Sequence, residues 1–164
     1  ERYKKAYLED FSGWDRSADA GYIDEEGYIW VMSRTDDIIN CAGHRLSTGA
    51  MEEVLSKHED IAECAVVGID DELKGQVPMG FIVINAGTSK PNNIIIDETI
   101  NMVRNEIGPV ASFRKVVIVN RLPKTRSGKI LRSTIASIVD KKPYKIPATI
   151  DDETILDEIK EAIK

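Results

Sequence analysis

Apolar positions along this chain alternate in some segments and recur every three or four residues in others. Residues 21–32 show the first pattern around a polar turn at 24–27, which predicts a β-hairpin. Further short β-rich runs are bounded by glycine or by polar residues. We expect these to form strands at 38–39, 44–46, 62–69, 80–84 and 116–119, with a turn at Gly43 and a polar loop at 70–77.

Helical spacing of apolar residues predicts helices between and after these strands. The last amphipathic stretch, 155–163, carries mainly Asp and Glu on its polar face, so we expect a packing helix rather than a membrane anchor. From Ile38 onward the pattern is that of a compact α+β unit. We expect one helix that is capped by Ser47 or Thr48 and ends near Lys57, and a second that is capped by Asp97 and stopped by Gly108-Pro109. An apolar stripe from Ile130 to Val139 predicts a third helix.

The composition limits the classes of partner. The chain has 164 residues, 42% of them hydrophobic, so it is about one domain long and can build a core. Its net charge of −6 argues against nucleic acid, because that binding relies on a basic face that neutralises phosphates. No apolar run approaches the ~20 residues that span a membrane. We expect neither nucleic acid nor membrane as a partner.

The two cysteines, Cys41 and Cys64, stand at no metal-ligand spacing, and only His44 and His58 could join them. We therefore expect no metal site, and two buried thiols in a reducing, intracellular compartment. The sequence starts at Glu1 without an initiator Met or a signal-peptide pattern, so we expect it to begin inside a longer protein.

A short basic loop runs from Pro123 to Lys129 and holds three cations within its last six residues. Ser and Gly supply turn geometry, so the loop could grip an anion, although basic turns of this kind are usually solvated surface. It is not a Walker A loop, because the glycine spacing is absent and Ile130 follows the lysine in place of Ser or Thr. Any anion bound here would therefore be held mainly by side chains.

A second segment, 33–46, resembles, together with this loop, the adenylate-forming family of acyl-CoA synthetases. The resemblance extends from about Asp19 to Lys142 and is greatest to the short-chain acetyl- and propionyl-CoA synthetases, with 142–150 closer to the propionate type. The motifs that carry it, in the family's order, are Arg34-x-Asp36-Asp37, Gly43-His44-Arg45, Gly75-Gln76, Ile107-Gly108-Pro109 and the Lys129 loop.

The resemblance covers only the small C-terminal lobe of those enzymes, a short central β-sheet flanked by helices. It implies that 1–35 is the tail of the preceding lobe and includes a β-hairpin, that 36–142 is the lobe itself, and that 143–164 is a C-terminal tail with a short helix. The large N-terminal lobe, which holds most of the ATP and acyl pocket, is not in this sequence, so we expect the chain alone to be inactive. The exposed hairpin face at Tyr28 and Trp30 would then lack its packing partner.

The resemblance also implies roles for four residues on or near the nucleotide side. Lys129 would be the cation that bridges the carboxylate and the α-phosphate during adenylation, the first half-reaction. Asp19 would accept hydrogen bonds from the ribose hydroxyls, although Ala18 stands where the family has Gly. Arg34 would contact ribose and α-phosphate, and Asp36 would be the hinge between the lobes.

Three further residues would serve the second half-reaction, in which the CoA thiol displaces AMP. Gly43 would line the pantetheine tunnel, where the absence of a Cβ lets the backbone approach the ligand. Arg104 would lie near the CoA nucleotide phosphates, and Arg45 would contact phosphate in one state of the lobe. For each of these positions an ordinary turn glycine or solvated arginine is the alternative.

We therefore expect the mobile lobe of an AMP-forming acid-thiol ligase that joins propionate or acetate to CoA. Its ligands would be ATP, CoA and Mg²⁺, bound mainly by the N-terminal lobe, which would be its partner, and an acetyltransferase could act on Lys129. The compartment would be cytoplasm or mitochondrial matrix. Two alternatives remain: another adenylating enzyme, such as a medium-chain or aryl-CoA ligase, since acyl choice lies in the other lobe, and a non-catalytic binding module.

Overall fold

A computed structural model describes residues 2–164; for Arg2, Lys5, Ala6, Met32, Ser33 and Asp36 it describes the backbone only. Its centre is a long antiparallel pair, β5 (Ile61–Asp71) and β6 (Gly75–Ile84). Both strands are rich in Val and Ile, which suit a pleated surface that is buried on both sides.

The turn between these strands is much shorter than the loop expected over 70–77. Residues 76 and 77 pair with 70 and 69, so the polar stretch continues the ladder and does not leave it. The turn closes because Asp71 accepts hydrogen bonds from the backbone N–H groups of Leu73 and Lys74 through its Oδ1. Gly75 then takes a positive φ of 76°, which favours glycine. The expected loop was therefore wrong in its extent.

Three shorter strands extend the sheet along the other edge of β6. β3 (Ile38–Cys41) pairs with the beginning of β6, and β4 (His44–Ser47) forms a hairpin with β3, as expected. β7 (Lys115–Ile118) runs parallel to the rest of β6. The strand order is β4-β3-β6-β5, with β7 also on β6.

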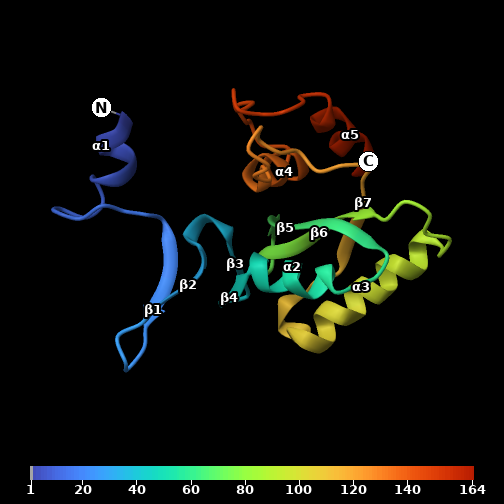
Figure 1. The fold of residues 1–164 in the computed structure, drawn as a ribbon, viewed down its shortest axis with the longest axis horizontal. Coiled ribbons are helices and arrows are strands. Elements are labelled where there is room, and N and C mark those ends of the chain that lie inside the picture. Colours follow the sequence, from blue (N-terminus) through green and yellow to red (C-terminus); the bar gives the residue numbers. More distant parts are fainter. Residues whose placement is uncertain (1) are drawn as a thin grey trace.

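Helices cover both faces of the sheet (Figure 1). α2 (Thr48–Ser56) and α3 (Asn92–Glu106) pack on one face, and α4 (Arg132–Val139) and α5 (Ile155–Ala162) pack on the other. Alternation along the strands divides the core accordingly, since a strand points successive side chains to opposite faces. Val66 and Ile82 face α2 and α3, whereas Val67 and Phe81 face α4 and α5. The expected α+β fold is confirmed.

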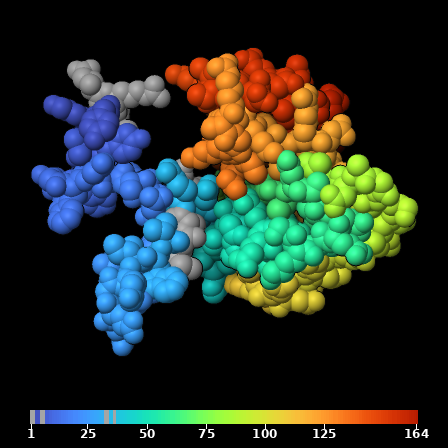
Figure 2. Space-filling view, in the orientation of Figure 1, coloured from blue at the N-terminus to red at the C-terminus, as the bar shows by residue number. Residues whose placement is uncertain are grey.

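The N-terminal part projects from this body (Figures 1 and 2). It contains α1 (Arg2–Tyr7), which was not expected, and the predicted hairpin of β1 (Asp19–Ile23) and β2 (Ile29–Arg34). The short 3₁₀ helix η1 (Thr35–Asp37) leads into β3. The hairpin exposes large side chains, among them Tyr22, Ile23, Tyr28, Ile29, Trp30 and Val31.

Two helix starts compare differently with the sequence. Ser47 caps α2, because its hydroxyl accepts a hydrogen bond from the backbone N–H of Ala50 at 3.3 Å. Asp97 does not cap α3, which begins five residues earlier at Asn92, directly after Pro91. Proline has no side-chain oxygen that could accept a capping hydrogen bond, and none is made at this start, so that expectation was wrong. α3 ends before Gly108, as expected, and the 3₁₀ helix η2 (Pro109–Ala111) follows.

Cys41 is fully buried and Cys64 is half-buried, so the expectation of two buried thiols holds for Cys41 only. Burial, and then the nearby Glu52 carboxylate, raise the pKa of Cys64 to about 11, so this thiol stays protonated near neutral pH. Within residues 2–164, no helix combines the length and apolar character that a membrane crossing requires.

The close packing of β6 against the 109–115 segment gives a test of the fold. A Cβ at Gly80 would lie 2.7 Å from the buried Phe113 ring, so Gly80→Ala should lower the free energy of unfolding by about 1–3 kcal/mol. At Gly49, within α2, a Cβ would make only an ordinary contact of 3.6 Å with Ser47. Gly49→Ala should therefore raise the free energy of unfolding by about 0.5–1 kcal/mol. Urea unfolding of both variants checks the opposite signs.

Candidate functional site

The basic loop before α4 is a tight β-hairpin turn. The backbone N–H of Gly128 donates to the Thr125 carbonyl at 2.8 Å, and the N–H of Thr125 donates to the Lys129 carbonyl at 2.8 Å. Gly128 has a φ of 83°, so a turn followed by a left-handed glycine closes the loop, an arrangement that specifies glycine here. The Thr125 hydroxyl also accepts from the Lys129 N–H at 3.1 Å. The backbone of the loop is therefore ordered by its own residues.

The three cations of the loop differ in their surroundings. Lys124 forms an ion pair with Glu63 of β5, at 2.6 Å between Nζ and Oε1. Arg126 and Lys129 are exposed. Among the residues that the structure describes, the Lys129 ammonium has no hydrogen-bond or ion-pair partner. Lys124 thus ties the loop to β5, whereas the side chain of Lys129 extends from the loop without such a contact among the described residues.

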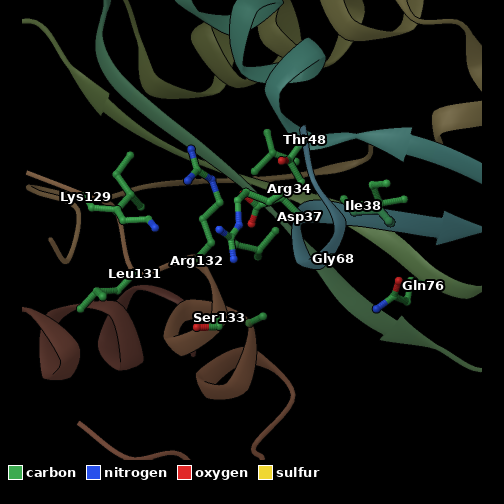
Figure 3. A pocket seen from close by; sticks show the side chains of 15 residues that line it. Arg34, Asp37, Ile38, Thr48, Gly68, Gln76, Lys129, Leu131, Arg132 and Ser133 are labelled. Atoms are coloured by element: carbon green, nitrogen blue, oxygen red, sulfur yellow. The ribbon is translucent and has the colours of Figure 1, made fainter. Parts of the chain in front are cut away.

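Lys129 lines a cleft of about 450 Å³ between the start of α4 and the sheet (Figure 3). The polar side chains of this cleft come from separate elements. Besides Lys129 they are Arg34 from β2, Asp37 from η1, Thr48 from α2, Gln76 from β6, and Arg132 and Ser133 from α4. Two residues expected to serve the nucleotide side, Arg34 and Lys129, therefore line the same cleft, although they are far apart in the sequence.

The wall of the cleft is held by an ion pair between Glu52 of α2 and Arg132 at the start of α4. Arg132 donates from Nε to Oε1 at 2.9 Å and from Nη2 to Oε2 at 2.7 Å, which is a bidentate pair. Both side chains are mostly buried, at 16% and 24% exposure. The hydrogen bonds with Glu52 raise the pKa of Arg132 against the opposing effect of burial. Glu52 also accepts the N–H of Val66 at 2.8 Å.

Asp19 and Arg34 are opposite one another across the β1–β2 ladder. Asp19 is exposed, and unlike Arg34 it is not among the residues that line the cleft. Ala18, before Asp19, has a φ of 62°, in the left-handed region. This backbone conformation explains why glycine suits the position, and alanine retains it at a cost of roughly 1 kcal/mol.

The remaining expected residues lie elsewhere. Gly43 has a φ of 84° in the β3–β4 turn, and a Cβ there would meet nothing within 4 Å. Arg45 on β4 and Arg104 in the last turn of α3 are exposed, and none of the three is among the cleft residues. The backbone of Asp36 lies in η1, and its side chain is outside the part that the structure describes.

Sequence reasoning missed two residues that shape the site, Glu52 and Arg132. The sequence offers a faint signal for each: Arg132 follows Lys129 by three positions, and Glu52 adjoins Met51 in the apolar stripe of its helix. Their pairing links positions 80 apart in sequence, which a local pattern does not encode.

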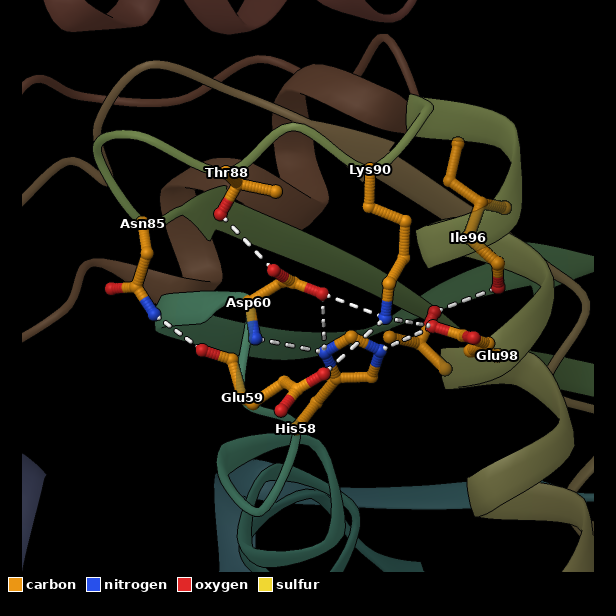
Figure 4. Close-up of polar contacts among 9 residues, drawn as sticks. His58, Glu59, Asp60, Asn85, Thr88, Lys90, Ile96 and Glu98 are labelled. Atoms are coloured by element: carbon orange, nitrogen blue, oxygen red, sulfur yellow. Dashed lines mark hydrogen bonds and ion pairs between the residues drawn. The ribbon is translucent and has the colours of Figure 1, made fainter.

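A second polar cluster lies at the other end of the sheet (Figure 4). The carboxylates of Asp60 and Glu98 and the ring of His58 come within 4.8 Å of one another, so they could serve as metal ligands. The Lys90 ammonium lies among them, 2.8 Å from Asp60 and 2.9 Å from Glu98. His58 Nδ1 accepts the backbone N–H of Asp60, which leaves the proton of a neutral ring on Nε2, toward Glu98. The cluster is therefore built as an ion-pair network that already contains its cation.

Comparison with known proteins places this geometry in a family. Residues 50–129 match the family described as "AMP-binding enzyme C-terminal domain". The chain is 53% identical over 97% of its length to a mitochondrial acyl-CoA synthetase short-chain family member B of Dictyostelium discoideum, of which it covers 23%. It is 41% identical over 99% of its length to an acetyl-coenzyme A synthetase of Pyrobaculum aerophilum, of which it covers 24%.

Among solved structures, the ATP-bound MatB of Rhodopseudomonas palustris superposes with a TM-score of 0.71 at 20% identity, over 85% of this chain and 27% of MatB. The fold is that of the C-terminal lobe of adenylate-forming enzymes. The chain belongs to the AMP-binding enzyme C-terminal domain family, and its relatives are short-chain acyl-CoA synthetases. It spans about a quarter of the length of the curated relatives it matches.

The ion-pair network around Lys90 predicts a pH-dependent contribution to stability. Lys90 holds the pKa values of Asp60 and Glu98 below their usual range, with His58 adding to the effect on Glu98. A depressed carboxyl pKa contributes stability above the unfolded value, and that stability is lost as the pH falls through the folded value. Lys90→Met should therefore lower the melting temperature at pH 7 and make little difference near pH 2. Melting curves between these pH values check this, and an equal loss at both would contradict it.

Proposed function

We propose that this chain is the mobile C-terminal lobe of an AMP-forming short-chain acyl-CoA synthetase that uses propionate or acetate. The observation that carries the proposal is the cleft that both Lys129 and Arg34 line. The names of the relatives, short-chain acyl-CoA synthetases and acetyl-coenzyme A synthetase, support the reaction class. The lobe would act in both half-reactions, adenylation of the carboxylate and transfer of the acyl group to CoA.

In adenylation, Lys129 would stand between the substrate carboxylate and the α-phosphate of ATP. Two anions repel one another, and a fixed ammonium between them stabilises the charge that develops as they react. The geometry supports this role because the backbone on either side of Lys129 is hydrogen-bonded while its ammonium is unpartnered within the described residues. Lysine suits the task as a compact charge on a flexible stem.

The hairpin would supply the ribose and phosphate contacts. Asp19 would accept the two ribose hydroxyls through its carboxylate, and Arg34 would donate to ribose and α-phosphate. Their cross-strand pairing supports a shared ligand. The proposal thus assigns the nucleotide side to β1, β2 and the lysine loop.

The second half-reaction would use other residues of the lobe. Gly43 would border the pantetheine arm, which its open position and lack of a Cβ favour. Arg45 and Arg104 would contact phosphates, since both are exposed cations outside the cleft. Asp36, in η1 between the hairpin and β3, would be the hinge that turns the lobe from one half-reaction to the other.

The partners would include the N-terminal lobe of the same enzyme, since the chain spans about a quarter of its relatives' length. That lobe would cover the exposed hairpin face and hold most of ATP, CoA and Mg²⁺, so the chain alone would be inactive. Residues 1–35 would belong to it, 36–142 would form the moving lobe, and 143–164 would follow as a tail. The compartment would be cytoplasm or mitochondrial matrix, and a lysine acetyltransferase could neutralise Lys129.

Lys129→Ala in the full-length enzyme should slow adenylation by a factor of ~100 or more, as expected for the loss of one preorganised electrostatic contact. Conversion of a preformed acyl-adenylate to acyl-CoA should continue at near the normal rate. Separate assays of the two half-reactions with propionate and with acetate measure both effects.

The matched control is Lys145→Ala, which removes an exposed lysine of the C-terminal tail and should alter neither half-reaction. A parallel fall of both half-reactions in Lys129→Ala would make Lys129 a folding or docking residue. Unchanged adenylation would refute its proposed role.

A further inference from the structure

The segment after α4 returns to the lysine loop and contacts it through two backbone hydrogen bonds. The backbone N–H of Arg126 donates to the Thr149 carbonyl at 2.9 Å, and the N–H of Asp151 donates to the Lys124 carbonyl at 2.9 Å. Thr125 and Ile150 are bridge partners in antiparallel orientation. On its other side, Lys124 is the bridge partner of Ile130. Isolated bridges therefore join the base of the loop to Ile130 on one side and to the C-terminal segment on the other.

The C-terminal segment around Ile150 is also fixed to the body of the lobe. Ile150 is 4% exposed and belongs to the core on the α4 and α5 face of the sheet. α5 follows it directly and buries Ile155, Leu156 and Ile159 in the same core. The segment is thus anchored on the core side and hydrogen-bonded to the loop on the other.

Arg121 ties the same segment to the chain just before the loop. Its guanidinium donates from Nη1 to Asp152 at 2.7 Å, from Nη2 to the Thr154 hydroxyl at 2.9 Å, and from Nε and Nη2 to Glu158 at 3.1 and 2.6 Å. Hydrogen bonds with Glu158, and then with Asp152, raise the pKa of Arg121. Because Arg121 lies three residues before Lys124, it joins the residues that follow Ile150 to the stem of the loop.

We propose that residues 147–158 are a positioning element for Lys129, held by Arg121. An isolated two-stranded hairpin is marginally stable in water, and the additional backbone hydrogen bonds with Thr149 and Asp151 make its geometry persistent. A catalytic group acts most effectively when its support is ordered before the substrate arrives, because the ordering entropy is then not lost in the reaction. The family match ends at residue 129, so this element lies outside it. The inference rests on the proposed role of Lys129.

The test is Arg121→Met in the full-length enzyme, followed by hydrogen exchange and by assays of the two half-reactions. Exchange at the Arg126 and Asp151 amides should become at least about tenfold faster, since separation of the C-terminal segment from the loop exposes both. Adenylation should slow about tenfold, whereas thioester formation from a preformed acyl-adenylate should stay within about twofold, as expected when only positioning for the first step is lost. Arg121→Lys, which keeps the charge but not the fork, should fall between wild type and Arg121→Met.

Two further variants distinguish the specific effect of this segment from a general loss of stability. Lys164→Met breaks an exposed ion pair with Glu161 at the end of the same chain and should change neither exchange nor rate. Asp151→Pro removes the N–H that bonds to Lys124 while leaving Arg121 in place, and should slow adenylation as Arg121→Met does.

Unchanged exchange at Arg126 and Asp151 in Arg121→Met would overturn the anchoring. Faster exchange with unchanged adenylation would overturn the positioning role. If Lys129→Ala leaves adenylation intact, the proposed function fails instead, and the exchange at these two amides still tests the anchoring.

Discussion

The partly buried pair of Glu52 and Arg132 is the interaction on which the geometry of this lobe depends. One carboxylate accepts two hydrogen bonds from the guanidinium and a third from the backbone of Val66. It therefore joins α2, the outer edge of β5 and the start of α4 at a single point. Removing one member of such a pair leaves an uncompensated charge, which destabilises more than the pair itself stabilises. The pair also satisfies a strand-edge N–H that would otherwise face the helix unpaired.

Lys129 precedes Arg132 by three residues, so the ion pair that fixes Arg132 also restricts where the backbone of Lys129 can lie. Before the loop, Arg121 and Lys124 hold the stem through ion pairs with the C-terminal segment and with β5. Contacts made by residues before the loop, by residues after it and by the C-terminal segment thus hold its base. The ammonium of Lys129 has no partner in the described part of the chain. A lysine that acts on a substrate held largely by another lobe needs a fixed backbone and an ammonium that is not engaged elsewhere.

Local signals in the sequence predicted local structure. The β1–β2 hairpin, the β3–β4 turn at Gly43 and the cap at Ser47 each depend on a few adjacent residues. The extent of β6 was missed because Pro78 and the polar residues before it read as a loop, although they pair with β5 across a tight turn. The start of α3 was missed because Pro91 leaves no side-chain cap to recognise.

The site was predictable only in part, for a related reason. A family resemblance proposed Arg34 and Lys129, and the structure places both on one cleft. The contacts that support Lys129 join residues far apart in sequence, such as 52 with 132 and 121 with 158. Charge pairs of this kind have no periodicity, so neither apolar pattern nor spacing reveals them.

The most direct test of the account is a double-mutant cycle with Glu52→Gln, Arg132→Met and the double variant, read as unfolding free energy and as adenylation rate in the full-length enzyme. Each single change should lower the unfolding free energy by about 2 kcal/mol, below the usual value for a fully buried pair because both side chains are partly exposed. The double variant should be no worse than either single variant in both readouts. Additive losses in the double variant would show that the two residues act independently, and would contradict the claim that their pairing positions Lys129.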